Sequence, residues 1–556
     1  MSHGADLAPH PARARSTRWP ASAERGAALA LIVAATAAIV GPIFAGPDRI
    51  PAGHDYALAV TLAEGYAEGL EDGYLYPRWV SRANAGHGIP ALIGYPPLGA
   101  MLVGTVRVLA GETAAAFRIV LCFVHLIGGL SFFLFARRFA RPLVAGIGAA
   151  LYVLAPYHVM VLYHRFAFAE IVSQAWLPLV LHFGLSLRAR PTLGSALGLA
   201  ASFALVLASH VVVAQMVVVG LGVVVLFASR PLRHPRRALA MGGALGLAAL
   251  LAGAYVIPVL ASRELVHWDA QYAPDRALPF VFATRGDEFT TLLELTFLVQ
   301  AGCLAPLLPM LWRGKHRALV TCLAAGLFAT LLHTAATLPL WRYLPGMQYL
   351  LYPYRFGLLA ALFCPLGVVF LTERRPALGA LAALASALAL LALPTLYDHP
   401  RYVSLRGRDL AVWNQEHIPR TVGSIYPRAP TEPRASLYGA GEASVLEWRS
   451  HTRRIRADVE PPGAQLRVAT WYFPGWEAQV DGVPRSIGPE AGTGLILVDL
   501  GPGAHEITLS FVDTPDRVIG AWVSSLAWLG FLALLVVAAR GHLRRRREAA
   551  RAAAPP

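Results

Sequence analysis

The sequence is poor in charged residues and in cysteine, and each shortage excludes a class of protein. Charged residues make up only 15% of its 556 positions, whereas a soluble domain averages about 25%. The mean hydropathy is +0.51, so an ordinary soluble enzyme is excluded and a polytopic membrane protein is indicated. The four cysteines all lie in apolar runs without CxxC or Cys/His spacing, which argues against a disulfide framework or a zinc site.

The positive charge of the chain is distributed as in membrane proteins. A net charge of +15 also suits a nucleic-acid partner, but the basic residues gather in short segments between apolar runs, which is the pattern of cytoplasmic loops. Residues 1–25 hold four arginines among prolines and are expected to form a disordered cytoplasmic tail. The apolar run Gly26–Phe44 is long for a signal-peptide core, so we expect a retained anchor.

A membrane-spanning helix needs about 20 mostly apolar residues. By this measure the sequence predicts an α-helical polytopic membrane protein with about twelve transmembrane helices. The expected spans lie near Gly26–Phe44, Ala114–Ala136, Leu143–Tyr157, Ile171–Leu187, Leu193–Ser209, Val211–Ala228, Ala238–Leu260, Thr291–Leu311, Ala318–Leu338, Arg355–Leu371, Ala377–Leu396 and Val518–Ala539.

The segment Leu92–Ala110 is apolar enough to count as a thirteenth span, and charge parity decides against it. A thirteenth span would move basic segments such as Arg230–Arg237 and Arg544–Arg547 to the outer face, against the positive-inside rule. Tyr95-Pro96-Pro97 also breaks helix geometry at the point of entry. We therefore expect residues 97–110 to form a juxtamembrane or re-entrant helix on the outer face.

The resulting topology is that of a multi-pass membrane protein with both termini in the cytoplasm. Residues 26–396 form the transmembrane module, with an outer loop at 47–113. Residues 397–517 form an extracytoplasmic domain, 518–539 the last transmembrane helix, and 540–556 a basic cytoplasmic tail. The polar residues that we consider functional fall mostly on the outer face, although they were not used to set the topology.

The extracytoplasmic segment changes character near Arg453. From there on, apolar and polar residues alternate, as expected of half-buried strands, and the segments are separated by turn signals such as Asp481-Gly482 and Gly501-Pro502-Gly503. A small antiparallel β-sandwich is the expected fold. The predicted strands are Arg454–Val459, Gln465–Val468, Glu477–Val480, Leu495–Val498 and Glu506–Phe511.

The outer loop carries the strongest candidate for a functional residue. Asp55 follows closely after the first apolar run, in the sequence Gly53-His54-Asp55-Tyr56. A carboxylate at the membrane surface in a partly desolvated cleft suits a general base, because burial raises its pKa toward the working pH. An exposed loop residue that caps a helix is the alternative.

Motifs in both halves of the chain are similar to known membrane proteins. The C-terminal motifs, Trp471–Gly482 and Pro502–Glu506, resemble the corresponding domain of the bacterial YfhO-like proteins. The N-terminal half resembles the "6-pyruvoyl-tetrahydropterin synthase-related" membrane proteins, although nothing in the sequence indicates pterin chemistry. The matching stretches are Pro77–Trp79, Asn84–Pro90, Tyr95–Leu98, His164–Glu170 and Gln348–Arg355.

Both groups resemble the GT-C superfamily of glycosyltransferases, which use polyprenyl-phosphate sugars. The resemblance implies a location in the bacterial inner membrane, a GT-C-like fold and a catalytic acid in the first outer loop, a position that Asp55 matches. The neighbouring residue is His54 rather than a second acid. The sequence therefore requires no metal or other cofactor, and a divalent cation stays an open alternative.

Four further residues are candidates for catalysis or for binding the donor phosphate. Glu170 is either a second catalytic acid or a carboxylate favoured by the dipole at a helix start. Arg355, Arg78 and Arg165, together with His164, are candidate phosphate ligands, because the planar guanidinium matches phosphate oxygens. An arginine at the end of a span also reaches the headgroups for purely structural reasons.

The remaining candidates are substrate-binding residues near the outer ends of apolar runs: His54, Tyr95, His210, Gln348 and Tyr352. Tyrosine at this level also forms the usual aromatic belt. The preferred hypothesis is a membrane glycosyltransferase with a polyprenyl-phosphate-sugar donor and an envelope glycan or lipid acceptor. The alternatives are a flippase or transporter for lipid-linked glycans and a non-catalytic scaffold whose β-domain binds glycans.

Overall fold

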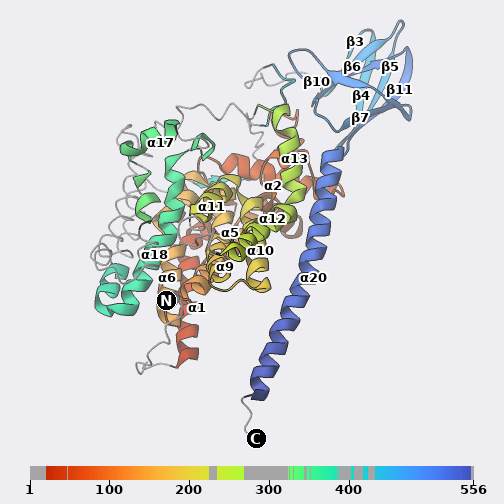
Figure 1. Cartoon of the computed structure of the whole chain (residues 1–556). Coiled ribbons are helices and arrows are strands. Elements are labelled where there is room, and N and C mark those ends of the chain that lie inside the picture. Colours follow the sequence, from red (N-terminus) through yellow and green to blue (C-terminus); the bar gives the residue numbers. More distant parts are fainter. Residues whose placement is uncertain are drawn as a thin grey trace.

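The computed structural model describes residues 20–46, 48–223, 234–267, 324, 326–329, 331–332, 334–343, 347–350, 352–384, 386, 402–405, 417–423 and 433–552. It shows a bundle of apolar helices with a β-rich domain at one end (Figure 1). A long C-terminal helix runs from the β-rich domain along the side of the bundle. The chain is therefore mostly helical with a β-rich region near the C-terminus.

Sixteen named α-helices build the helical part that the structure describes. They are α1 (Ala21–Val40), α2 (Tyr56–Glu71), α3 (Ala91–Gly94), α4 (Pro97–Ala110), α5 (Thr113–Ala136), α6 (Pro142–Val153), α7 (Pro156–Met160), α8 (Phe168–Gln174), α9 (Leu177–Ala189), α10 (Leu193–Ser209), α11 (Val211–Val223), α12 (Pro235–Leu251), α13 (Gly253–Ser262), α17 (Leu338–Tyr343), α18 (Gly357–Arg374) and α20 (Pro515–Ala552). Short turns of other helix types include η1 (Gly41–Ala45), η2 (Val161–Arg165), η9 (Met347–Leu350) and η10 (Pro353–Phe356).

Proline and glycine set several helix boundaries. Pro97 starts α4, where a missing amide hydrogen costs nothing and the fixed φ suits the helix. Gly111 ends α4 at a φ of 80°, a left-handed conformation that glycine adopts without strain. These signals give a 14-residue helix that ends shortly before α5.

The described residues account for part of the twelve expected membrane-spanning helices. Within the described residues, six helical segments are long and apolar enough to cross a membrane, or seven if the bent pair α12–α13 counts as one span. The expected span Thr291–Leu311 lies outside the described residues, and three others (Val211–Ala228, Ala318–Leu338 and Ala377–Leu396) lie partly outside them. The six segments are Ala21–Ala45, Thr113–Ala136, Pro142–Arg165, Phe168–Ala189, Pro353–Arg374 and Pro515–Arg545.

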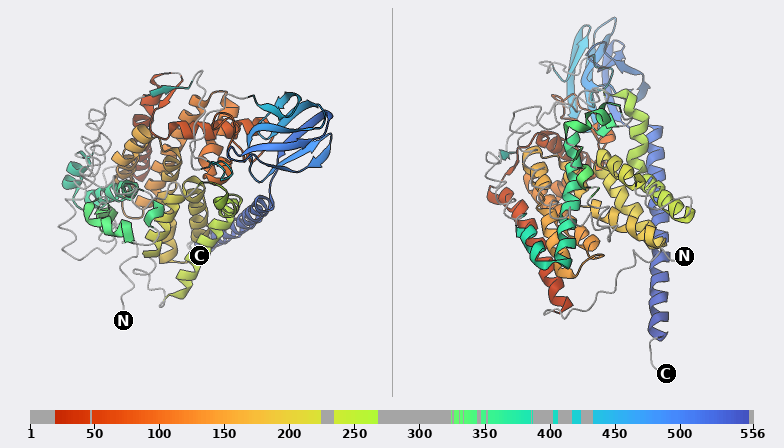
Figure 2. Two further views of the ribbon diagram at one scale, coloured as in Figure 1. Left: turned by 90° about the horizontal axis from the view of Figure 1, so that it is seen from above. Right: turned by 60° about the vertical axis from the view of Figure 1, so that its left-hand side comes forward.

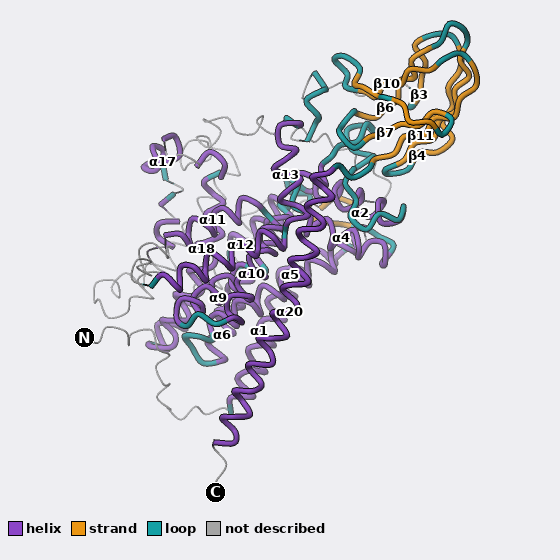
Figure 3. The backbone as a smooth tube through the Cα atoms, turned by 45° about the vertical axis from the view of Figure 1, so that its right-hand side comes forward, coloured by secondary structure: helices purple, strands orange, loops and turns teal. Residues whose placement is uncertain are grey.

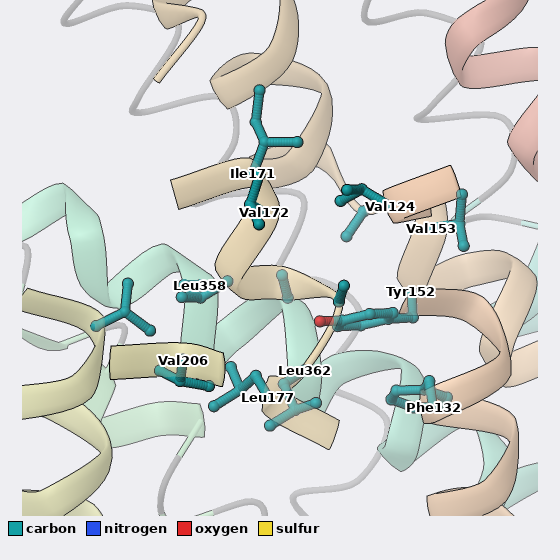
Figure 4. Packing of buried hydrophobic residues seen from close by; sticks show 14 of the residues in the cluster. Val124, Phe132, Tyr152, Val153, Ile171, Val172, Leu177, Val206, Leu358 and Leu362 are labelled. Carbon is teal, nitrogen blue, oxygen red and sulfur yellow. The ribbon is translucent and has the colours of Figure 1, made fainter. Parts of the chain in front are cut away.

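The bundle core is formed by aliphatic and aromatic side chains from helices that are distant in sequence (Figure 4). The rings of Phe132 in α5 and Tyr152 in α6 stack with their centroids 4.9 Å apart. Leu358 of α18 belongs to the same buried cluster as Leu177 of α9 and Val206 of α10. Within a bilayer, close van der Waals packing of this kind holds α18 against the N-terminal helices.

The β-rich domain (residues 433–514) consists of two antiparallel sheets. Their strand orders are β3-β6-β10-β9 and β4-β5-β11-β7-β8. Strand β5 alternates buried and exposed residues, with Ile455, Ala457 and Val459 buried, so one face of the sheet contributes to a core. The strands are β3 (Ala435–Tyr438), β4 (Gly441–Trp448), β5 (Thr452–Val459), β6 (Ala464–Trp471), β7 (Trp476–Val480), β8 (Val483–Arg485), β9 (Ile487–Pro489), β10 (Leu495–Leu500) and β11 (Gly503–Phe511).

Five of these strands coincide with the segments whose alternation predicts strands, and the β-region begins earlier than expected. Strands β3 and β4 lie before Arg453, where the alternation is expected to begin. In β4 most residues are exposed, so the alternation of buried and exposed residues is weak. A further short pair links β1 (Arg49–Pro51) with β2 (Tyr402–Ser404).

The β-rich domain packs against the first loop, residues 48–112, which carries α2, α3 and α4 (Figures 2 and 3). One hydrophobic cluster contains Trp79 and Ile89 of this loop together with Trp471, Trp476 and Phe511 of the domain. The first loop and the β-rich domain therefore share a core.

Candidate functional site

Asp55 lies where the chain enters α2, beside the turn η2. The backbone N–H of Asp55 donates to the carbonyl of Arg165 at 2.8 Å, and the N–H of His54 donates to the carbonyl of His164 at 3.2 Å. A Cβ on Gly53 would lie 2.3 Å from the carbonyl carbon of Arg165, so this close approach requires glycine. Phe166, the next residue, adopts a φ of 49°, which is rare for a bulky side chain.

A buried guanidinium lies between the two predicted catalytic carboxylates. Arg165 Nη1 is 2.8 Å from Glu170 Oε2, and Arg165 Nη2 is 3.5 Å from Asp55 Oδ2. The side chains of Arg165 and Glu170 are 5% and 1% exposed, whereas Asp55 is 44% exposed. The structure thus brings the three residues together and leaves Asp55 as the carboxylate that solvent or a substrate can reach.

Two tyrosines that sequence reasoning did not select complete this group. The hydroxyl of Tyr157 donates to Glu170 Oε1, and the Arg165 guanidinium carbon lies 4.8 Å from the centroid of the Tyr354 ring. Both carboxylate oxygens of Glu170 are therefore engaged. The only sequence signal was the presence of tyrosine next to proline at the ends of apolar runs, which is also typical of an aromatic belt.

Three histidines surround the group. The rings of His54 and His164 meet edge to face with centroids 4.9 Å apart. His210, between α10 and α11, accepts from the N–H of Val213 at 3.2 Å through Nδ1 and interacts electrostatically with Glu170. All three predicted histidines therefore lie at or near the carboxylates.

Arg355 approaches the group from η10, just before α18. Its Nη1 donates to the carbonyl of Leu350 at 3.2 Å, and its guanidinium carbon lies 5.2 Å from the centroid of the Tyr352 ring. It interacts electrostatically with Glu170. Among the described residues, its buried Nε has no hydrogen-bond partner and no carboxylate lies within ion-pair distance of it.

Two predicted site residues lie elsewhere. Arg78 Nη1 donates to the carbonyl of Ala254 at 3.1 Å, and Arg78 Nε is 3.5 Å from Asp513 Oδ1, so Arg78 belongs to the contact between the first loop, α13 and the β-rich domain. Tyr95 contacts the ring of His417, with centroids 6.2 Å apart. Gln348 lies in η9, and its side chain is outside the described part of the structure.

The acidic and histidine side chains do not form an evident metal cage. Within the described residues, no group of three or more His, Cys, Asp or Glu side chains is arranged to hold a metal ion. Glu170 is occupied by Arg165 and Tyr157, so Asp55 is the carboxylate left to bind a cation or a substrate hydroxyl. Chemically, this group can accept a proton at the half-exposed carboxylate of Asp55, next to the fixed positive charge of Arg165.

A family model matches residues 94–398, more than half of the chain, and describes a "6-pyruvoyl-tetrahydropterin synthase related domain; membrane protein". No curated protein matches the chain in sequence.

Two solved structures show weak similarity in their backbones. One is the archaeal oligosaccharyltransferase AglB from Archaeoglobus fulgidus in complex with an inhibitory peptide and a dolichol-phosphate, at 14% identity and a TM-score of 0.42. The matched region covers 67% of this chain and 56% of the AglB chain. The other is the Archaeoglobus fulgidus oligosaccharyltransferase in the apo form, at 14% identity and a TM-score of 0.38. Here the matched region covers 67% of this chain and 54% of the other. The chain thus spans little more than half of either protein, and similarity at this level leaves function to be argued from its own residues.

Proposed function

This chain belongs to the family of 6-pyruvoyl-tetrahydropterin synthase related membrane proteins, and we propose that it is an integral-membrane glycosyltransferase. It moves a sugar from a polyprenyl-phosphate-linked donor to a cell-envelope glycan or lipid. The reaction takes place at the outer face of the bacterial inner membrane, with both termini in the cytoplasm.

The observation that carries this proposal is the asymmetry between two carboxylates on one guanidinium. Asp55 is 44% exposed and lies 3.5 Å from Arg165, whereas Glu170 is buried and holds the same guanidinium at 2.8 Å. A reachable carboxylate fixed by a buried positive charge suits a general base that activates a hydroxyl nucleophile. Its place beside helices that are long enough to span a membrane suits a substrate carried on a lipid.

In the proposed reaction the acceptor hydroxyl attacks the anomeric carbon of the donor. Asp55 takes the hydroxyl proton as the new glycosidic bond forms, and the bond between the anomeric carbon and the phosphate oxygen breaks. The polyprenyl phosphate leaves with the electron pair of that bond. Glu170 takes no part in the proton transfer, because both of its oxygens are engaged; it positions Arg165.

The leaving phosphate needs positive charge that is not already neutralised. Arg355 supports this role best, since its Nε–H has no partner and no carboxylate pairs with it in the described part of the chain. Arg165 and the nearby His164, His54 and His210 provide further hydrogen-bond donors. Tyr352 presents a ring next to Arg355 on which a sugar can stack.

The test is transfer of radiolabelled sugar from a polyprenyl-phosphate donor by the purified chain in proteoliposomes, with empty vesicles as the blank. We expect labelled product together with release of free polyprenyl phosphate. Movement of the donor across the bilayer without product would favour the flippase instead. Glycan binding without transfer or movement would favour the scaffold.

A further inference from the structure

We infer that the β4–β5 turn of the β-rich domain, residues Ser450 and His451, positions Asp55 through helix α2. The inference rests on the proposed function of Asp55 as the base. Helix α2 has 16 residues and is therefore roughly 24 Å long at 1.5 Å per residue. Asp55 precedes the first residue of α2, and the turn bonds to Asp72, the residue that follows its last.

The N-terminal end of α2 is fixed to the bundle. Two backbone hydrogen bonds, from His54 to His164 and from Asp55 to Arg165, tie the entry of the helix to η2. The close contact at Gly53 leaves no room for a different path of the chain. A shift of α2 along or across its axis therefore strains the two backbone hydrogen bonds that place Asp55.

The C-terminal end of α2 is fixed to the β-rich domain. Asp72, the C-cap residue of α2, accepts on Oδ2 from the backbone N–H of Ser450 at 2.8 Å and from its hydroxyl at 2.5 Å. A carboxylate that accepts two hydrogen bonds is held more firmly than either bond alone would hold it. The end of the helix therefore follows the turn.

His451 extends this contact to the segment after α2. Its Nε2 accepts from the backbone N–H groups of Arg78 at 3.0 Å and Trp79 at 3.1 Å. Nε2 is therefore unprotonated, and the proton on Nδ1 donates to the Ser450 hydroxyl at 2.9 Å. The ring also stacks on Tyr74 with centroids 4.3 Å apart. The turn thus accepts from two backbone N–H groups of the first loop and donates to the Asp72 carboxylate, and these bonds form one connected chain.

Apolar contacts beside the turn keep it in place. The buried ring of Trp79 meets Trp476 with centroids 5.5 Å apart and Phe511 with centroids 5.1 Å apart. Arg78 adds contacts with Ala254 of α13 and with Asp513, just before α20. The β-rich domain is therefore a structural support for the helix that presents Asp55.

The experiment measures hydrogen–deuterium exchange of the full chain in nanodiscs, because amide exchange near Asp55 can be measured whether or not the protein transfers sugar. The variants are His451→Leu, which removes the acceptor, and His451→Gln, which keeps one. Ser450→Ala is a second test that leaves the ring in place. His505→Leu is the matched control, since His505 bonds only with Asp481 and Gly501 of its own domain in the contacts that the structure describes.

We expect exchange in a peptide covering residues 53–58 to become about tenfold faster in His451→Leu and to change less than threefold in His451→Gln and His505→Leu. Peptides of β5, β6 and β11 keep their protection, which shows that the domain is folded. If residues 74–80 exchange faster in His451→Leu and Ser450→Ala while residues 53–58 do not, the inference is wrong. Failure of sugar transfer by the unmodified chain would count against the proposed base and would leave the exchange result standing.

Discussion

The buried pair between Arg165 and Glu170 allows the assignment of Glu170 as a positioning residue to be tested by measuring stability. The two side chains are 5% and 1% exposed, with 2.8 Å between Nη1 and Oε2. Replacing Arg165 leaves the Glu170 charge buried without its ion-pair partner, which costs about 3–5 kcal/mol. Replacing Glu170 leaves Arg165 with the half-exposed Asp55 as its remaining carboxylate partner, at 3.5 Å. Glu170→Gln is the mildest such change, because it keeps the volume and an oxygen for the Tyr157 hydroxyl.

The free energy of unfolding, followed by tryptophan fluorescence in mixed detergent micelles, measures this cost. We expect Arg165→Met to lose about 3–5 kcal/mol and Glu170→Gln to lose less, because Asp55 still pairs with Arg165. The double variant should lose at least about 2 kcal/mol less than the sum, because no unpaired charge remains. Glu548→Gln, in the exposed pair with Arg544, is the control and should change the free energy by less than about 0.5 kcal/mol. Additive single changes below about 1 kcal/mol would refute the reasoning.

Three other predictions follow from the same contacts. Burial lowers the pKa of His451 to about 4, with Arg453 adding to the effect and Asp72 opposing it. The unfolded chain therefore binds the proton on His451 more tightly than the folded chain does. Up to about 3 kcal/mol of the stability that is present above pH 6.5 is lost as the pH falls toward 4. Unfolding at pH 7 and pH 4.5 should show this loss, and His451→Gln should reduce it; an equal loss in both proteins would contradict the assignment. Gly53→Ala should abolish transfer, because its Cβ meets the Arg165 backbone at 2.3 Å, whereas Gly41→Ala, with nothing within 4 Å, should leave transfer and expression unchanged. Arg355→Lys should raise the KM for the sugar donor at least about tenfold, because the guanidinium hydrogen bonds are lost. Arg78→Lys should lower stability and leave that KM within about twofold. The reverse pattern would show that Arg78, and not Arg355, binds the phosphate.

The parts of the fold that sequence patterns predicted are those governed by local hydrophobicity. Apolar runs predicted the helices Thr113–Ala136 and Phe168–Ala189 closely, since a membrane-spanning helix is recognised by its length and composition. Alternation predicted β5 for the same reason. Strand β4 was missed because most of its residues are exposed.

The site was predictable as a set of residue types and not as an arrangement. Asp55, Arg165 and Glu170 were selected for their position near the ends of apolar runs, and the structure places them together. Their division of roles depends on which carboxylate is buried, which no local pattern encodes. Arg78 shows the opposite case, because the ring that accepts from its backbone belongs to His451, 373 positions away along the chain.

The most direct test of the account is the rate of sugar transfer by Asp55→Asn. This change keeps the shape of the side chain and removes its charge and its ability to accept a proton. Asp48→Asn, in the same loop, is the matched control. We expect Asp55→Asn to lose at least about a thousandfold in kcat while its unfolding free energy stays close to that of the unmodified chain and Asp48→Asn transfers normally. Undiminished transfer by a folded Asp55→Asn would contradict the central claim that Asp55 is the base.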